Sequence, residues 1–384
     1  MKTFSEYKNH PKSRLVSEST STQYTLFPKN KYELQQMIKE EIKKQGCHAD
    51  LNHIDTSAIK DMSMLFWKEY RFDGDVSGWD VSNVTDMSHM FYMARAFNCD
   101  VSGWDVSNVT DMSGMFARAE SFNQDLSGWD VSNVTTMENM FSDASSFNGD
   151  ISTWDVRNVK NMSHMFHYDS NFNGNLKRWN TKNVTNISFM FSNCENFNQD
   201  LSRWDVSNAK YMRGMFYGCR SFNHSVSEWN VSDVTDMGWM FFGCKSFNQD
   251  LSRWDVSAVE YMDNMFDGCS TFDQDLSRWD VSKVTNMNYM FNTCRSFNQD
   301  LSKWNVSKVL YMTCMFYGCE SFNSDISRWD VSNVEKMISM FRDAKSFNQD
   351  ISRWDVSKVD AFDRIFENCP CPEEHRPKFI LNHI

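Results

Sequence analysis

The cysteines are the residues of this chain best suited to chemistry, and most of them recur at a fixed spacing of 25 residues. In a stacked repeat, neighbours in such a column would lie roughly 5 Å apart, which permits a disulfide by distance but gives parallel side chains poor torsion angles. Alanines share the column, so we expect small, buried, free thiols rather than disulfides or a zinc site, and free thiols favour a reducing history. The column contains Cys194, Cys219, Cys244, Cys269, Cys294, Cys319 and Cys369, with Ala94, Ala119, Ala144 and Ala344.

Carboxylates and amides also form columns. Calcium held between coils is one interpretation of the acidic columns, but the unit lacks the tight glycine-rich loop of calcium-binding repeats. We therefore expect these carboxylates to close turns through Asx bonds or to face solvent, and the amides to satisfy backbone groups of their own and the next coil. The columns are Asp75, Asp100, Asp125 and Asp150; Asp80, Asp105, Asp130 and Asp155; and Asn98, Asn123, Asn148, Asn173 and Asn198, with Asp73 and Asp273.

The histidines indicate no catalytic site. Of the nine, only His164 and His167 share a helical face, and no column carries them. The chain has no G-x-S-x-G, H-E-x-x-H or phosphate-binding glycine loop. Cys369, Cys371 and His375 offer three metal ligands near the C-terminus, which is a weak pattern. We predict a non-enzymatic protein with no catalytic, cofactor-binding or metal-binding residues.

The 25-residue spacing of these columns recurs in other residue types along most of the chain. Tryptophan recurs every 25 residues from Trp79 to Trp354, and phenylalanine does so from Phe66 to Phe366. A fixed period of this length is typical of solenoids and is too short for a propeller blade. The 384 residues are therefore one repeat array rather than two or three domains.

Two periodicities alternate inside one repeat. Leu126, Trp129 and Val131 read as a short strand. The stripe that follows has helical spacing and consists of Val134, Met137, Met140 and Phe141. We predict an α/β solenoid, a leucine-rich-repeat-like right-handed stack of about thirteen coils, each with a short strand plus a short helix or 3₁₀ turn.

The two ends differ from the repeat. Asn30 and Glu33 form a capping-box-like pair and Gly46 is a natural stop, so a capping helix is expected over 30–46. We expect a loosely attached tail at 1–29, the solenoid at 47–369, and a C-terminal cap or tail at 370–384.

The phrase FNCDVSGWDVSNVTDMSGMF, at 97–116, resembles the repeats of BspA-like bacterial surface proteins. These repeats are leucine-rich-repeat-like, and related arrays occur in mycoplasma lipoproteins. The resemblance covers about residues 47–369. It implies a leucine-rich-repeat-type solenoid displayed on a bacterial surface and associated with adhesion or protein binding.

Partner-binding candidates lie in two groups. Aromatic residues occupy helical-segment positions that are small or polar in other coils, and aromatics are enriched at binding hot spots. Local packing against neighbouring coils is an equal alternative for these residues. An arginine column beside the tryptophans either forms an ion-pair network with flanking aspartates, which we favour, or forms a basic stripe on a concave sheet. The candidates are Tyr211, Tyr217, Trp239, Phe242, Tyr261, Tyr289, Tyr311, Tyr317, Arg203, Arg253, Arg278 and Arg328; the expected structural ladders include Trp104, Trp129, Trp204, Asn123, Asn198, Cys219 and Cys244.

The net charge of −12 argues against a nucleic-acid partner, and no apolar run is long enough to span a bilayer. We predict a scaffold for protein–protein binding, adhesin-like by resemblance, with an intracellular scaffold or a calcium-stiffened rod as alternatives. The resemblance suggests the cell surface or secretion. The polar N-terminus, which shows no signal peptide, and the free cysteines suit the cytoplasm.

Overall fold

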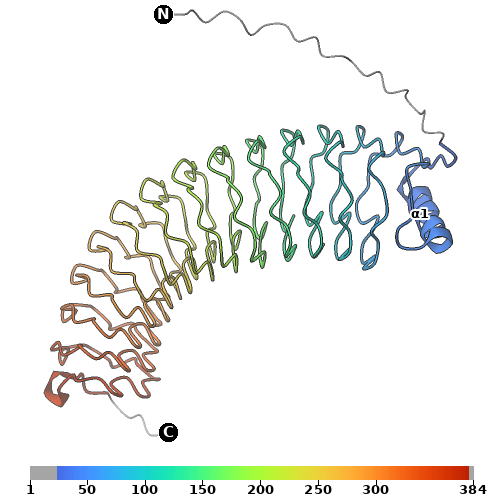
Figure 1. The fold of residues 1–384 in the computed structure, drawn as a ribbon. Helices are drawn as coiled ribbons and strands as arrows, with labels where there is room; N and C mark the ends of the chain where they lie inside the picture. Colours follow the sequence, from blue (N-terminus) through green and yellow to red (C-terminus); the bar gives the residue numbers. More distant parts are fainter. Residues whose placement is uncertain (1–23, 380–384) are drawn as a thin grey trace, which may run out of the picture.

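A computed structural model describes residues 24–379, which form a curved stack of coils with one 25-residue repeat per coil (Figure 1). Within these residues, regular helix is confined to α1 (Lys31–Gln45) and the 3₁₀ helix η1 (Glu373–His375). Neighbouring coils meet through isolated parallel bridges, such as that between Thr136 and Asn161, instead of extended strands. The predicted repeat stack is therefore present, but the predicted strand and short helix in each coil are wrong.

Each coil is a series of tight turns. The N–H groups of Trp129, Val134 and Met140 donate to the carbonyl oxygens of the residues three positions earlier, at 3.0, 3.0 and 3.2 Å. Successive turns bring the first and last residue of each turn to the inside, which produces the spacing of three that resembles a helical stripe. Asn139 and Asp143 have φ of 56° and 61°, so the backbone enters the left-handed region twice and a right-handed helix cannot continue.

Aromatic ladders fill the interior. The rings of Phe116 and Phe141 stack at 5.7 Å, and those of Trp129 and Trp154 stack at 6.4 Å. Trp129 is only 4% exposed, and its indole N–H donates to the carbonyl oxygen of Val101 in the preceding coil at 3.0 Å. The indole N–H, the one polar group of the tryptophan side chain, is therefore buried with a hydrogen-bond partner. A single coil could not bury the faces of these rings, so the coils must stack.

The ladder spacings explain why the stack curves. Coils are closest at 137–143, where the N–H groups of Met137, Asn139 and Phe141 each donate at 2.9 Å directly to backbone carbonyl oxygens of the next coil. On the tryptophan side, side chains such as the Trp129 indole bridge the coils, and the ring spacing is wider. The stack is an arc in Figure 1, and from these spacings we infer that the 136–143 side of every coil lies on its inside and the tryptophan side on its outside.

Both ends of the stack are covered. The Asn30 side chain accepts the N–H groups of Tyr32 and Glu33 at 3.0 and 3.1 Å, and Leu34 on α1 is fully buried. Part of the expected N-terminal tail pairs with the first coil, because Leu26 bridges Ile54; residues 1–23 lie outside the described residues. At the other end, the rings of Phe379 and Phe362 stack at 4.6 Å, and residues 380–384 are not described.

Candidate functional site

One surface of the arc differs from the rest, and we call it the concave strip. It consists of five side-chain columns, and the other residues of the same segment, such as Met137, Met140 and Phe141, are buried. The strip therefore presents side chains that the interior does not use. The five columns contain Thr136, Glu138, Asn139, Ser142 and Asp143, each continued at 25-residue intervals.

Side chains in the concave strip vary from coil to coil, although the backbone repeats. In the Ser142 column, aromatic, charged, amide and small residues follow one another without a consensus. The convex face instead repeats an Asp-x-Ser turn, as in Asp150 and Ser152. A position that changes from a ring to a charge to a small side chain, while the backbone stays the same, indicates that the stack itself does not determine these side chains. The Ser142 column reads Trp67, Tyr92, Ala117, Ser142, His167, Ser192, Tyr217, Phe242, Asp267, Asn292, Tyr317 and Arg342.

Several aromatics of the strip occupy a backbone conformation that does not favour them. Phe189, Trp239 and Tyr289 have φ of 54°, 62° and 57°. Glycine and asparagine, which tolerate the left-handed region, fill the same column at Gly214 and Asn264. Each aromatic in this position costs about 1 kcal/mol or more. A large side chain is therefore present where the backbone would prefer a small one.

Three of these rings form a cluster that we call the aromatic ledge: Tyr217, Trp239 and Phe242. Tyr217 and Phe242 are parallel with ring centroids 4.5 Å apart, and Trp239 lies 5.2 Å from Phe242 and 5.7 Å from Tyr217. All three are partly exposed. The ledge is a preformed apolar surface that spans two coils.

An ion-pair cluster holds the ledge in place. The Arg213 guanidinium donates to Asp236 at 3.0 Å and to Asp263 at 2.7 Å, so it joins three successive coils. Asp263 also accepts the indole N–H of Trp239 at 2.7 Å. Gly238 makes this possible, because a Cβ there would lie 2.3 Å from the Arg213 Nη1 atom.

The eight predicted aromatics all lie in the concave strip. Tyr211, Tyr261 and Tyr311 continue the Thr136 column, Trp239 and Tyr289 the Asn139 column, and Tyr217, Phe242 and Tyr317 the Ser142 column. Tyr211 and Tyr261 are 50% and 44% exposed. Their binding role stays a prediction. Sequence reasoning did not select Phe189 or Arg213, although Phe189 shares its column with Trp239.

The predicted arginines lie elsewhere. Arg203, Arg253, Arg278 and Arg328 flank the tryptophan column, which places them on the convex face rather than in a stripe on the concave one. Among partners within residues 24–379, Arg253 forms an ion pair, with Glu228 at 2.8 Å, and the other three arginines form none. The favoured network is therefore wrong at the other three. The aspartates instead accept serine N–H groups two residues on, which lowers the pKa of carboxyls such as that of Asp250.

The amide and thiol columns connect neighbouring coils. The Asn123 N–H donates to the side chain of Asn98 at 3.0 Å, and the Asn198 side chain accepts the N–H of Asn223 at 3.0 Å. The Asn123 side chain is exposed rather than buried at its turn. The thiols of Cys219 and Cys244 donate to carbonyl oxygens in the preceding coil at 3.0 and 2.9 Å. Burial raises the pKa of both thiols, and all eleven cysteines are free.

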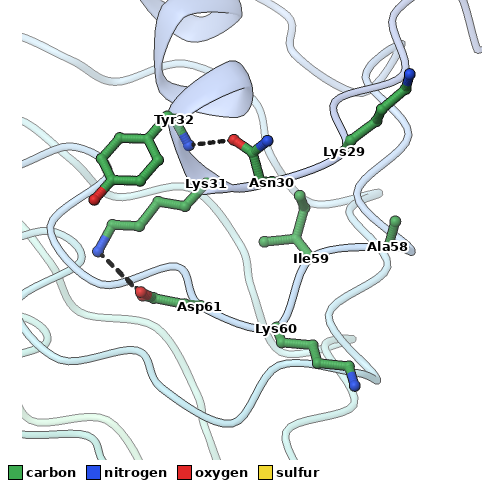
Figure 2. A pocket seen from close by; sticks show the side chains of 8 residues that line it. All are labelled: Lys29, Asn30, Lys31, Tyr32, Ala58, Ile59, Lys60 and Asp61. Carbon is green, nitrogen blue, oxygen red and sulfur yellow. Dashed lines mark hydrogen bonds and ion pairs between the residues drawn. The ribbon is translucent and has the colours of Figure 1, made fainter.

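A small pocket lies at the start of α1 (Figure 2). Lys31 contacts Asp61 there at 3.1 Å, and Asn30 caps the first helical N–H groups. Lys31 and the helix N-terminus are therefore already paired. Residues 24–379 contain no group of three or more His, Cys, Asp or Glu side chains that could hold a metal ion. In the same range, the helices are too short or too polar to cross a membrane.

Comparison with known proteins identifies a family of repeats. The family described as "Mycoplasma protein of unknown function, DUF285" matches residues 32–154, 136–250, 212–319 and 292–375. No curated protein matches the chain.

Two solved structures of repeat proteins are similar at low identity. The TLR13–ssRNA13 complex is 10% identical, with a TM-score of 0.23, and the match covers 83% of this chain and 51% of that chain. An LRR protein of Leptospira interrogans is 6% identical, with a TM-score of 0.21, and the match covers 85% and 93%. Both TM-scores are low, so neither structure bears on what this chain binds.

Proposed function

The chain belongs to the DUF285 family, whose description assigns no function, and we propose that it is a non-enzymatic repeat scaffold that binds a protein through its concave strip. One observation carries this proposal. Large aromatics such as Trp239 and Tyr289 occupy left-handed backbone positions in a column of the concave strip whose residue type changes from coil to coil. Strained, partly exposed aromatics that the stack does not need are consistent with a binding role.

The aromatic ledge supplies the chemistry of a protein-binding hot spot. Tyr217, Trp239 and Phe242 hold one another in place, so little side-chain entropy is lost when a partner covers them. Rings of this kind bury large apolar areas when a partner binds, and they are enriched among the residues that dominate binding energy. We expect the ledge to contribute more affinity than any other part of the strip.

The charges of the strip favour a protein over a nucleic acid. Asp236, Asp263 and Asp267 lie around the ledge, and Arg213 is already paired with the first two. With a net charge of −12, the chain would repel a phosphate backbone at this surface. A protein segment with apolar and cationic side chains fits the ledge and its carboxylate neighbours better.

An adhesin-like role at a bacterial surface is the more specific form of the proposal, and the resemblance to BspA-like repeats supports it. An intracellular scaffold is the alternative, which the eleven free cysteines favour. Fractionation of native cells with thiol titration separates the two. A surface pool would support adhesion, and a soluble pool with reduced thiols would support the intracellular scaffold.

The binding surface can be tested by capture experiments with the full chain. Tyr217→Ser combined with Phe242→Ser replaces two ledge rings with the residue that the same column has at Ser192. We expect the affinity of this variant for a captured partner to fall at least tenfold, while its thermal unfolding midpoint stays near that of the wild type. The matched control, Arg253→Ser with Arg278→Ser on the convex face, should bind normally. Loss of binding only in the convex variant would refute the proposal.

A further inference from the structure

From Ala94 to Cys369, the small-residue column inside the stack contains one side chain that does not match its neighbours. Between Ala144 and Cys194 the column carries Asp169 instead of alanine or cysteine. The Asp169 side chain is 0% exposed, and neither of its carboxyl oxygens has a hydrogen-bond partner. An ionised carboxylate in such a place would carry a very large desolvation cost.

The thiols of the same column show what this position requires. The thiol of Cys194 donates to the carbonyl oxygen of Phe166 at 3.0 Å, and that of Cys219 donates to Phe191 at 3.0 Å, each 28 residues upstream. The carbonyl in the same register for Asp169 is that of Phe141. The register of the cysteines therefore directs the Asp169 side chain toward this carbonyl oxygen, which would repel an ionised carboxylate and could accept the proton of a neutral carboxyl.

The surrounding groups do not supply a counter-charge. From the preceding coil Asp143 raises the pKa of Asp169 further, and from the following coil the facing group is the thiol of Cys194. His167, two residues earlier, cannot compensate, because burial and the neighbouring His164 lower its pKa to about 4 and leave it neutral. The backbone N–H groups of Asn171 and Phe172 lower the pKa of Asp169 and so offset part of the effect of burial, but neither forms a hydrogen bond to the carboxyl oxygens.

We propose that Asp169 is a neutral carboxylic acid that donates its proton to the Phe141 carbonyl oxygen, and that its ionisation opens this coil of the stack as the pH rises. The Asp169 carboxyl then replaces the thiol of the other coils as the hydrogen-bond donor. A modest rise in pH can remove its proton and so abolish the hydrogen bond. The thiols lack this property because burial places their pKa values well above the ordinary value.

The sign of the pH dependence follows from the direction of the shift. Burial raises the pKa of Asp169 from 3.8 to about 8, so the folded chain holds a proton that the unfolded chain has lost. The opening constant of the coil therefore rises about tenfold per pH unit from just above pH 4 to about pH 8, and then levels off. This dependence is opposite to that of exposed Asx carboxyls such as those of Asp150 and Asp250, whose pKa values are lowered.

Hydrogen exchange can measure this opening directly. The Phe172 N–H donates to the Asp169 carbonyl oxygen at 3.2 Å, so its protection factor reports on the coil. In the wild type we expect the protection factor to fall about a hundredfold from about pH 5 to about pH 7. Asp169→Asn keeps the shape without the charge, and Asp169→Ala restores the residue of Ala144; both should remove this dependence. Asp150→Asn, at an exposed Asx carboxyl, should keep the pH dependence of the wild type.

A titration of the wild type keeps the test independent of the variants. The ¹³C signal of the Asp169 carboxyl should titrate far above the ordinary aspartate range. A carboxyl that titrates near its ordinary value would overturn the proposal. So would equal pH dependence in the wild type and in Asp169→Asn.

Discussion

The two faces of the arc are built on the same backbone and differ in almost everything else. On the convex face, Trp129 and its equivalents repeat without change, and aspartates such as Asp130 cap the same turn in nearly every coil. On the concave strip, neighbouring coils carry residues as different as Gly214, Trp239 and Asn264 at one position. The convex side of each coil thus serves the stack, and the concave side is free to serve a partner.

The largest expected effect lies in the repetitive part. Trp204 is 3% exposed, stacks on Trp179 at 6.2 Å and donates to the Leu176 carbonyl oxygen at 2.9 Å. Trp204→Ala should lower the free energy of unfolding by about 3–5 kcal/mol, because it leaves a cavity and an unpaired carbonyl. Urea denaturation measures this change. A loss below about 1 kcal/mol would show that the tryptophan column is not core.

A smaller effect is expected where the concave strip departs from its own consensus. Gly238→Ser introduces serine, the commonest residue at this position in the other coils, but places a Cβ 2.3 Å from the Arg213 Nη1 atom. The guanidinium must move, and we expect a loss of about 1–3 kcal/mol in the free energy of unfolding. Adding Arg213→Ser should recover part of the loss. A single variant as stable as the wild type would mean that the ion-pair cluster does not hold the ledge.

Tyr289→Asn should separate binding from folding. Asparagine tolerates φ of 57° better than tyrosine, and Asn264 already occupies the equivalent position of the preceding coil. We expect stability to stay unchanged or to rise by up to about 1 kcal/mol, while binding of a captured partner weakens. Calorimetry and a binding titration on the same sample test this pair of outcomes. Lower stability would indicate that Tyr289 supports the stack.

The smallest effect is expected on the convex face. Arg278 is exposed and forms no ion pair among the residues that the structure describes. Arg278→Gly, which restores the residue of Gly128, should change the free energy of unfolding by no more than about 0.5 kcal/mol and leave binding intact. A clear loss of binding would move the interaction surface to the convex face.

The sequence predicts the period, the buried columns and the capping helix, because each depends on residue type and spacing. The helix expected at 30–46 runs over Lys31–Gln45. The apolar spacing predicts a strand and a short helix in each coil, where the structure has tight turns. Consecutive turns place apolar residues three positions apart, as a helix does. Left-handed positions such as Trp239 escape detection because the column is not limited to glycine.

The candidate site could be predicted only in part. The aromatics stand out as departures from the repeat, and their positions beside the buried stripe indicate a shared surface. The curvature cannot be read from one coil, because it arises from the difference between backbone-bonded and side-chain-bridged spacings. For that reason the sequence alone does not assign the arginine column to the convex face. The Arg213 cluster joins residues 50 positions apart and becomes visible only when the coils are stacked.

The account rests on the 136–143 side of each coil being the inner side of the arc, and two distances test this directly. Spin labels introduced as unnatural amino acids at Thr136 and Tyr261, and in a second sample at Gly128 and Arg253, span the same 125 residues on opposite faces. With a strand-like spacing of about 4.8 Å per coil, the concave pair should lie about 24 Å apart, and the convex pair should lie at least about 5 Å farther apart. Equal distances, or a shorter convex pair, would contradict the assignment of the two faces.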